Sequence, residues 1–129
     1  MEKQRITFPD PNLEDAIRDT VGKPEGSIYT SDLEHLTVLD AVGRGISDLT
    51  GLEYCVNLYA LYLYNNNISD ISPLAGLNNL ETLALTNNNI SDISALGNLG
   101  RLEYLDLERN NISDISALAD LPNLENLRL

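Results

Sequence analysis

Residues 57–78 read NLYALYLYNNNISDISPLAGLN, residues 79–100 read NLETLALTNNNISDISALGNLG, and residues 101–122 read RLEYLDLERNNISDISALADLP. These stretches are near-copies of one unit and follow each other without a gap. The opening of a further copy, NLENLRL, occupies 123–129. An unbroken period of 22 residues predicts one structural unit that is repeated in space.

Each copy begins with an L-x-x-L-x-L pattern, as in Leu58, Leu61 and Leu63. The last two leucines fall on one face of an extended segment, which indicates a short strand. The remainder of the first copy carries the apolar residues Ile68, Ile71, Leu74 and Leu77. Such a unit cannot bury its leucines alone. Stacking buries them, because strand then lies beside strand at about 4.8 Å.

The pattern L-x-x-L-x-L-x-x-N-x-I/L resembles leucine-rich repeats, and the 22-residue length with ISDISPLAGL resembles the subclass of bacterial internalins. The resemblance implies an α/β solenoid, a right-handed superhelix with a parallel sheet on its concave face. It also implies that one asparagine of each copy turns inward and satisfies backbone groups where the chain leaves the strand. These asparagines are Asn66, Asn88 and Asn110.

The segment before the repeats is expected to be helical. A helix is predicted over 9–22, where Asp10 is suited to cap it and Gly22 to end it. A second, short helix is expected near Ser31, because Ser31 and Glu34 have the spacing of a capping box. This segment resembles the helical N-terminal cap of internalin-type proteins, and a cap would shield the first layer of the core.

Residues 35–56, HLTVLDAVGRGISDLTGLEYCV, align as a degenerate first repeat in which Arg44 replaces the asparagine. We therefore expect one continuous domain. Its tail and helical cap would occupy 1–35. The leucine-rich repeats would occupy 36–129, as four units and a truncated fifth.

The composition is that of an acidic globular chain. Its 129 residues include 8 basic and 20 acidic ones, which gives a net charge of −12. A chain of this length needs no metal or disulfide to fold, and we expect no cofactor. Its charge repels phosphate backbones and anionic membranes, and no run approaches the ~20 apolar residues of a membrane span, so neither nucleic acid nor membrane insertion is expected. The favoured account of the acidity itself is solubility of a leucine-rich stack.

The strand side chains between the leucines should face outward on the concave surface, and there the copies differ. Tyr62, Tyr64 and Tyr104 fall on this face. Exposed tyrosines are enriched where proteins bind partners, so we predict a surface for a protein, peptide or glycan with basic groups. The alternative is that tyrosine merely suits strands. The candidate set is completed by Tyr59 at the rim, Asp40, Asp106, Glu108 and Arg109.

An aspartate also recurs every 22 residues, at Asp48, Asp70, Asp92 and Asp114. Stacked carboxylates could attract calcium. The favoured interpretation is that each aspartate caps a short helical turn, because one carboxylate per repeat at ~5 Å forms a ladder and not a six-oxygen cage. No metal site is predicted.

His35 and Cys55 are the sole histidine and the sole cysteine. One turn of the solenoid could bring them together as a nucleophilic pair. Cys55 aligns with the core residue Leu77, however, and a core thiol is normally inert. With no third group identifiable, we predict no catalytic residues and no enzyme activity.

The end of the chain suggests a second function. Leu129 lies inside the fifth unit, and an uncapped strand would leave backbone groups unpaired and leucines half covered. We therefore keep self-assembly into a homo-oligomer as the alternative. Its edge would comprise Leu124, Leu127, Arg128 and Leu129. The resemblance implies a secreted or bacterial cell-surface protein whose signal and anchor lie outside this chain, as in an excised or engineered domain.

Overall fold

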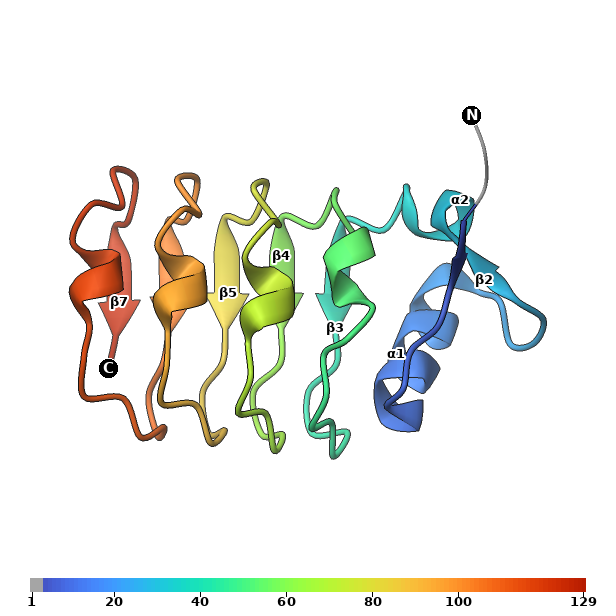
Figure 1. The fold of residues 1–129 in the computed structure, drawn as a ribbon, viewed down its shortest axis with the longest axis horizontal. Coiled ribbons are helices and arrows are strands. Elements are labelled where there is room, and N and C mark those ends of the chain that lie inside the picture. Colours follow the sequence, from blue (N-terminus) through green and yellow to red (C-terminus); the bar gives the residue numbers. More distant parts are fainter. Residues whose placement is uncertain (1–3) are drawn as a thin grey trace.

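Five short strands form one parallel sheet in the computed structural model, which describes residues 4–129 (Figure 1). They are β3 (Val38–Asp40), β4 (Ala60–Tyr62), β5 (Thr82–Ala84), β6 (Tyr104–Asp106) and β7 (Asn126–Arg128). The strands follow one another across the sheet in chain order, and the register advances by one repeat at each step. Leu61 thus pairs with Leu83, and Leu83 with Leu105. The predicted solenoid is confirmed.

The opposite side of each coil is a single turn of 3-10 helix. These turns are Leu52–Tyr54, Ser72–Leu74, Ser94–Leu96 and Ser116–Leu118. The recurring aspartate precedes each of the last three turns and accepts a hydrogen bond from the serine that begins it. The first of these bonds joins the Ser72 amide to Asp70 Oδ1 at 2.8 Å, and the equivalent bonds are 2.9 Å long. Asp70, Asp92 and Asp114 therefore bind the first amide of each turn from one residue before its N-cap position. Asp48 instead accepts the Thr50 amide, ahead of the turn Leu52–Tyr54, so the predicted interaction with the turn is found for three of the four aspartates.

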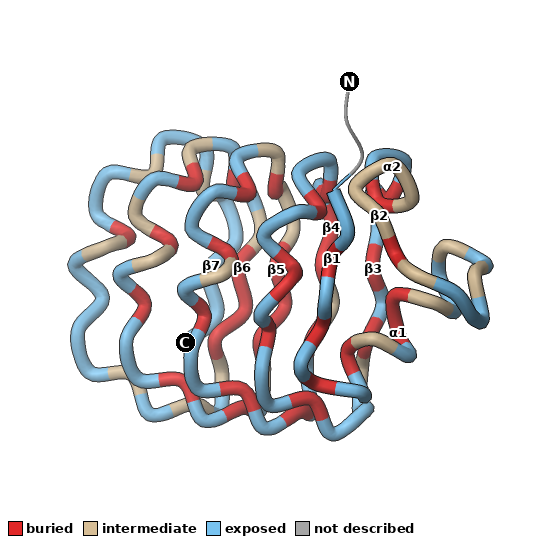
Figure 2. The backbone as a smooth tube through the Cα atoms, turned by 45° about the vertical axis from the view of Figure 1, so that its right-hand side comes forward, coloured by how far each residue is buried: buried red, intermediate tan, exposed pale blue. Residues whose placement is uncertain are grey.

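The repeated leucines and isoleucines lie between the sheet and the 3-10 turns, as the buried positions in Figure 2 show. Leu61, Leu83 and Leu105 have no exposed surface. Burial falls toward the C-terminal copy, where Leu127 is 38% exposed. Each buried layer therefore depends on the copies on both sides of it.

The inward asparagines connect neighbouring coils. Asn88 Oδ1 accepts the Ile68 amide of the preceding coil at 3.0 Å. Its Nδ2 donates to the carbonyl oxygens of Leu63 at 3.1 Å and Leu85 at 3.0 Å. Asn66 and Asn110 make the same set of bonds one repeat away. The predicted role of these asparagines is confirmed.

The first helix, α1 (Pro11–Val21), lies against β3. Its cap is Asp10, whose Oδ1 accepts the Asn12 amide at 2.9 Å, and Gly22 ends it with φ of 73°. Asp10 Oδ2 accepts the amides of Ser47 at 2.8 Å and Asp48 at 3.0 Å. One buried carboxylate therefore both starts the helix and binds it to the first repeat.

The second helix differs from the prediction. It is α2 (Thr30–Leu33), so it begins one residue before Ser31. The carboxylate that reaches back to its start belongs to Asp32, whose Oδ2 accepts the Tyr29 amide at 2.8 Å, and not to Glu34. Asp32 and Glu34 are both acidic residues near the start of this helix. The capping-box spacing from Ser31 predicted Glu34 as the capping partner, but Asp32 has that role.

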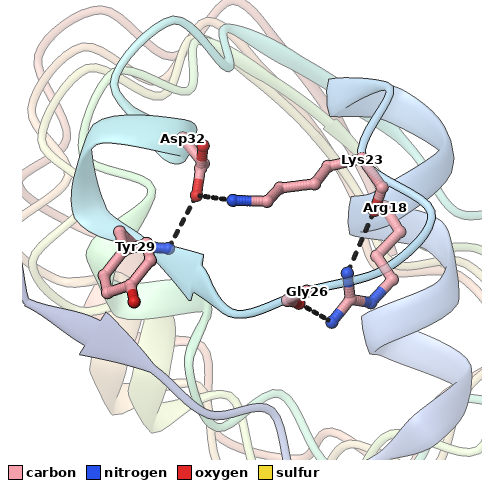
Figure 3. A network of polar contacts seen from close by, with 5 residues as sticks. All are labelled: Arg18, Lys23, Gly26, Tyr29 and Asp32. Atoms are coloured by element: carbon pink, nitrogen blue, oxygen red, sulfur yellow. Dashed lines mark hydrogen bonds and ion pairs between the residues drawn. The ribbon is translucent and has the colours of Figure 1, made fainter.

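A small polar network organises the turn between the two helices (Figure 3). Arg18 donates from its guanidinium to the carbonyl oxygens of Lys23 at 3.0 Å and Gly26 at 2.7 Å. Lys23 Nζ lies 3.0 Å from Asp32 Oδ2. The chain then forms β2 (Ile28–Tyr29), which pairs antiparallel with β1 (Arg5–Ile6). That this segment is the family's cap stays a prediction.

Candidate functional site

The register of the sheet fixes which side chains share a row on its outer face. Leu39, Leu61, Leu83 and Leu105 are fully buried, so the residues on either side of each leucine belong to the opposite face. One row runs through Val38, Ala60, Thr82, Tyr104 and Asn126, and the next runs through Asp40, Tyr62, Ala84, Asp106 and Arg128. These rows match the outward positions that the sequence predicts.

The rows enclose a hollow of about 620 Å³ over the middle of the sheet. Its lining residues are Tyr62, Tyr64, Thr82, Ala84, Thr86, Tyr104 and Asp106. The small side chains come from β5 and from Thr86, the second residue after it. The larger ones come from β4 and β6 and from Tyr64, the second residue after β4. Small residues between two taller rows therefore produce the depression, and three of the predicted binding tyrosines border it.

Asp106 is more buried than its outward position suggested. Only 8% of the residue is exposed. Its Oδ1 accepts the Glu108 amide at 3.0 Å, and the Tyr104 hydroxyl donates to Oδ2 over a longer distance of 3.5 Å. The Asp106 carboxylate thus contacts residues two positions before and after it on its own strand segment. The alternation of inward and outward side chains does not predict this burial.

Other predicted binding residues lie outside the hollow. Asp40 is exposed on β3, Tyr59 is exposed directly before β4, and Glu108 is half-buried. Arg109 is exposed and has a backbone φ of 60°. The structure therefore gathers four of the eight candidates, Tyr62, Tyr64, Tyr104 and Asp106, around one depression.

Comparison with known proteins identifies the family to which these repeats belong. A family model described as leucine rich repeat matches residues 56–112 and 91–129, which together make up more than half of the chain. The chain belongs to the leucine-rich-repeat family. Internalin H of Listeria monocytogenes is 36% identical over 63 residues, a match that covers 47% of this chain and 12% of that protein.

Solved structures of internalins are similar over nearly the whole chain. An internalin of L. monocytogenes, InlF, superposes with a TM-score of 0.92 at 42% identity, covering 95% of this chain and 36% of that one. Internalin C2 of the same species gives 0.68 at 33% identity, covering 93% and 64%. The leucine-rich repeats described here are therefore internalin-like. The chain spans about a third of the length of InlF.

The predicted assembly edge comprises residues on and beside β7, the last described strand of the leucine-rich repeats. Leu124 is half-buried, Arg128 is exposed, and Leu127 and Leu129 are 38% and 58% exposed. In residues 4–129, β7 has a neighbouring strand on one side only. This places the four residues together at one end of the stack.

The two candidate catalytic side chains occupy different environments. Cys55 is fully buried, and burial, with a smaller contribution from Glu53, raises the pKa of its thiol to about 12. The His35 side chain is 90% exposed. The thiol is therefore protonated at neutral pH, and among the described residues no interaction joins it to His35. Nor does the described part of the chain contain three clustered metal-ligating side chains or a helix able to cross a membrane.

The floor of the hollow is a feature of the candidate site that sequence reasoning missed. Thr82, Ala84 and Thr86 occupy outward positions of the repeat pattern but are not among the candidate residues. The signal was available in the aligned copies, where the position of Ala84 carries Tyr62 on one side and Asp106 on the other. A small residue between two large ones at equivalent positions indicates a depression.

Proposed function

We propose that the outer face of the sheet binds a protein or peptide partner. The observation that carries this proposal is the hollow over β5, which Tyr62, Tyr64 and Tyr104 border. Tyrosine contributes a large apolar area and a polar hydroxyl with little conformational freedom to lose, which suits it to binding surfaces. Tyr64 is 38% exposed with no packing role in the described core, so its area is available to a partner.

The charge of the protein favours a partner with basic groups. The chain carries a net charge of −12, and Asp40, Asp106 and Glu108 lie on or beside the proposed surface. Complementary charge accelerates association and disfavours acidic partners. We further propose that the module acts by binding and not by catalysis, and that it belongs to a secreted or surface-attached bacterial protein.

A peptide-library selection against the purified protein tests this proposal. Peptides that recognise the sheet face should lose at least about tenfold in affinity when both Tyr62 and Tyr104 are changed to alanine, since each is a hot-spot candidate. The matched control is Tyr54→Ala, because Tyr54 is an exposed tyrosine on the opposite side of the coil, in the 3-10 turn Leu52–Tyr54. Selected peptides that bind the double variant as tightly as the original protein would refute the proposed surface.

Self-assembly through β7 stays the second candidate. It is favoured by the exposed side chains of Leu127 and Leu129 at the end of the sheet. Light scattering over a wide concentration range tests it directly. Growth of the mass with concentration, abolished by changing both leucines to serine, would support assembly, and a constant monomer mass would exclude it.

A further inference from the structure

One row of the sheet places an aromatic residue and a carboxylate on opposite sides of an alanine. Tyr62 on β4 pairs with Ala84 on β5, and Ala84 pairs with Asp106 on β6. All three side chains line the hollow. Ala84 carries only a methyl group and is 6% exposed, so it forms the floor of a narrow slot whose walls differ in chemistry, a phenol on one side and an acid on the other.

The spacing of strands sets the width of the slot. β4 and β6 are separated by β5, so their backbones lie about 9.6 Å apart at the usual strand spacing of about 4.8 Å. Side chains stand nearly perpendicular to a sheet, so the walls keep about this separation. With contact distances of about 3.5–4.0 Å on both sides, the remaining space admits a layer one side chain thick.

The acid wall retains capacity to accept hydrogen bonds. One oxygen of Asp106 accepts a single backbone amide at 3.0 Å, and the other has only the 3.5 Å contact with the Tyr104 hydroxyl. Arg128 follows Asp106 in the row, yet none of the ion pairs among residues 4–129 involves Asp106. A carboxylate that is 8% exposed and lacks a cation is a strong site for one.

We propose that this slot receives an arginine side chain of the partner. The inference rests on the proposed function and specifies the chemistry of the segment that is recognised. A guanidinium is flat enough for the slot, stacks on the face of a tyrosine and donates to a carboxylate. Tyr62 supplies the aromatic face and Asp106 the carboxylate, while the negative charge of the protein attracts a basic segment.

A titration followed by nuclear magnetic resonance tests the slot. The probe is the blocked tripeptide glycyl-arginyl-glycine amide, and its matched control replaces arginine with citrulline, the uncharged isostere. The arginine peptide should produce saturable shifts at the backbone amides of Thr82, Ala84 and Thr86. The citrulline peptide should bind at least about tenfold more weakly, because it loses the charge-assisted hydrogen bond and the cation–π contact.

Two variants separate the slot from general attraction to an acidic protein. Asp106→Asn preserves the acceptor for the Glu108 amide but removes the charge, and should weaken the arginine peptide about tenfold. Asp120→Asn removes one charge from an exposed residue that does not line the hollow, and should leave affinity unchanged.

Several results would overturn the inference. They are equal affinity of the citrulline or a lysine peptide, shifts that map away from β5, the absence of saturable shifts, and an Asp106→Asn variant that binds normally. These failures remain distinct from failure of the proposed function. Selected peptides that require Tyr62 and Tyr104 but contain no arginine would retain the binding face and remove the arginine slot.

Discussion

Tyr62 and Asp106 face each other across Ala84 in a single row of the sheet, on strands two positions apart. Neither residue belongs to the repeating pattern, since the equivalent position carries Asp40 in the first copy and Arg128 in the last. The leucines and asparagines fix the distance between such positions, and substitutions in the row change its chemistry without changing its geometry. Because the core positions repeat and the outward positions vary, one scaffold can carry different surface chemistries.

The asparagine ladder should be a major source of stability. Asn88→Ala leaves the Ile68 amide and the Leu63 and Leu85 carbonyl oxygens without their partner in the interior. Because a buried unsatisfied group costs about 1–3 kcal/mol, we expect the free energy of unfolding to fall by about 3 kcal/mol. Urea denaturation measures it. Asn89→Ala, at an exposed neighbour, is the control, and equal losses in the two variants would contradict the assignment.

Arg109 occupies a backbone conformation that suits other residues better. Its φ is 60°, whereas the equivalent positions of the preceding copies carry Asn65 at 62° and Asn87 at 60°. Asparagine tolerates this left-handed region, and most side chains pay about 1 kcal/mol there. Arg109→Asn should therefore raise the free energy of unfolding by about 1 kcal/mol in urea denaturation. Arg101→Asn, at an exposed arginine without positive φ, should bring no gain, and a destabilised Arg109→Asn would show that the side chain makes a compensating contact.

Asp10 should make the attachment of α1 sensitive to acid. Burial alone would raise the pKa of Asp10, but hydrogen bonds from the amides of Ser47, Asp48, Asn12 and Leu13 outweigh it and hold the pKa below its usual value. A lowered folded-state pKa means that this stabilisation is fully present above the unfolded-state pKa. It is lost as the pH falls through the folded-state pKa. Stability measured by urea denaturation should thus decline from about pH 4 downward.

The variant Asp10→Asn isolates this contribution. Asparagine can still cap α1, but its amide nitrogen cannot accept the hydrogen bonds from Ser47 and Asp48. We expect a loss of about 2 kcal/mol at pH 7, the usual size for hydrogen bonds to a charged group. The difference between the two proteins should shrink in acid. An unchanged difference between pH 7 and pH 2 would contradict a charged Asp10 as the cause.

The exposed aspartates of the 3-10 turns provide a second acid-sensitive set. The amide and hydroxyl hydrogen bonds from Ser72 lower the pKa of Asp70, and Ser94 and Ser116 do the same for Asp92 and Asp114. These groups therefore favour the folded state above their unfolded-state pKa and lose that contribution in acid. Chemical shifts of their carboxyl carbons should titrate below the usual aspartate range. Titration within that usual range would contradict a role of these serine hydrogen bonds.

The architecture was predictable because it follows from a 22-residue repeat that is visible in the sequence. Leu58, Leu80 and Leu102 mark the strands, and the inward asparagines follow them at a fixed distance. The start of α2 was missed because Asp32 and Glu34 offer competing capping partners over a helix of four residues. The hollow depends on three strands at once, so no single copy contains the information for it.

The surroundings of Asp106 in the slot could not be predicted from its position in the repeat alone. Asp106 was expected on the surface as a binding residue, but only 8% of it is exposed, and its carboxylate accepts the Glu108 amide and lies 3.5 Å from the Tyr104 hydroxyl. The division into a cap over 1–35 and repeats over 36–129 stays a proposal. Proteolysis that trims one part without unfolding the other would argue against a continuous domain.

The affinity of a library-selected peptide for Ala84→Leu tests the central claim most directly. Leucine at this position projects into the slot from the floor and leaves the buried leucines of β5 untouched. Val38→Leu, an outward change on β3 away from the hollow, is the control for added apolar area. The account predicts an unchanged fold and at least about a tenfold loss of affinity for Ala84→Leu alone, the size expected when a central contact is blocked. Full affinity in a folded Ala84→Leu protein would show that the partner does not enter the slot.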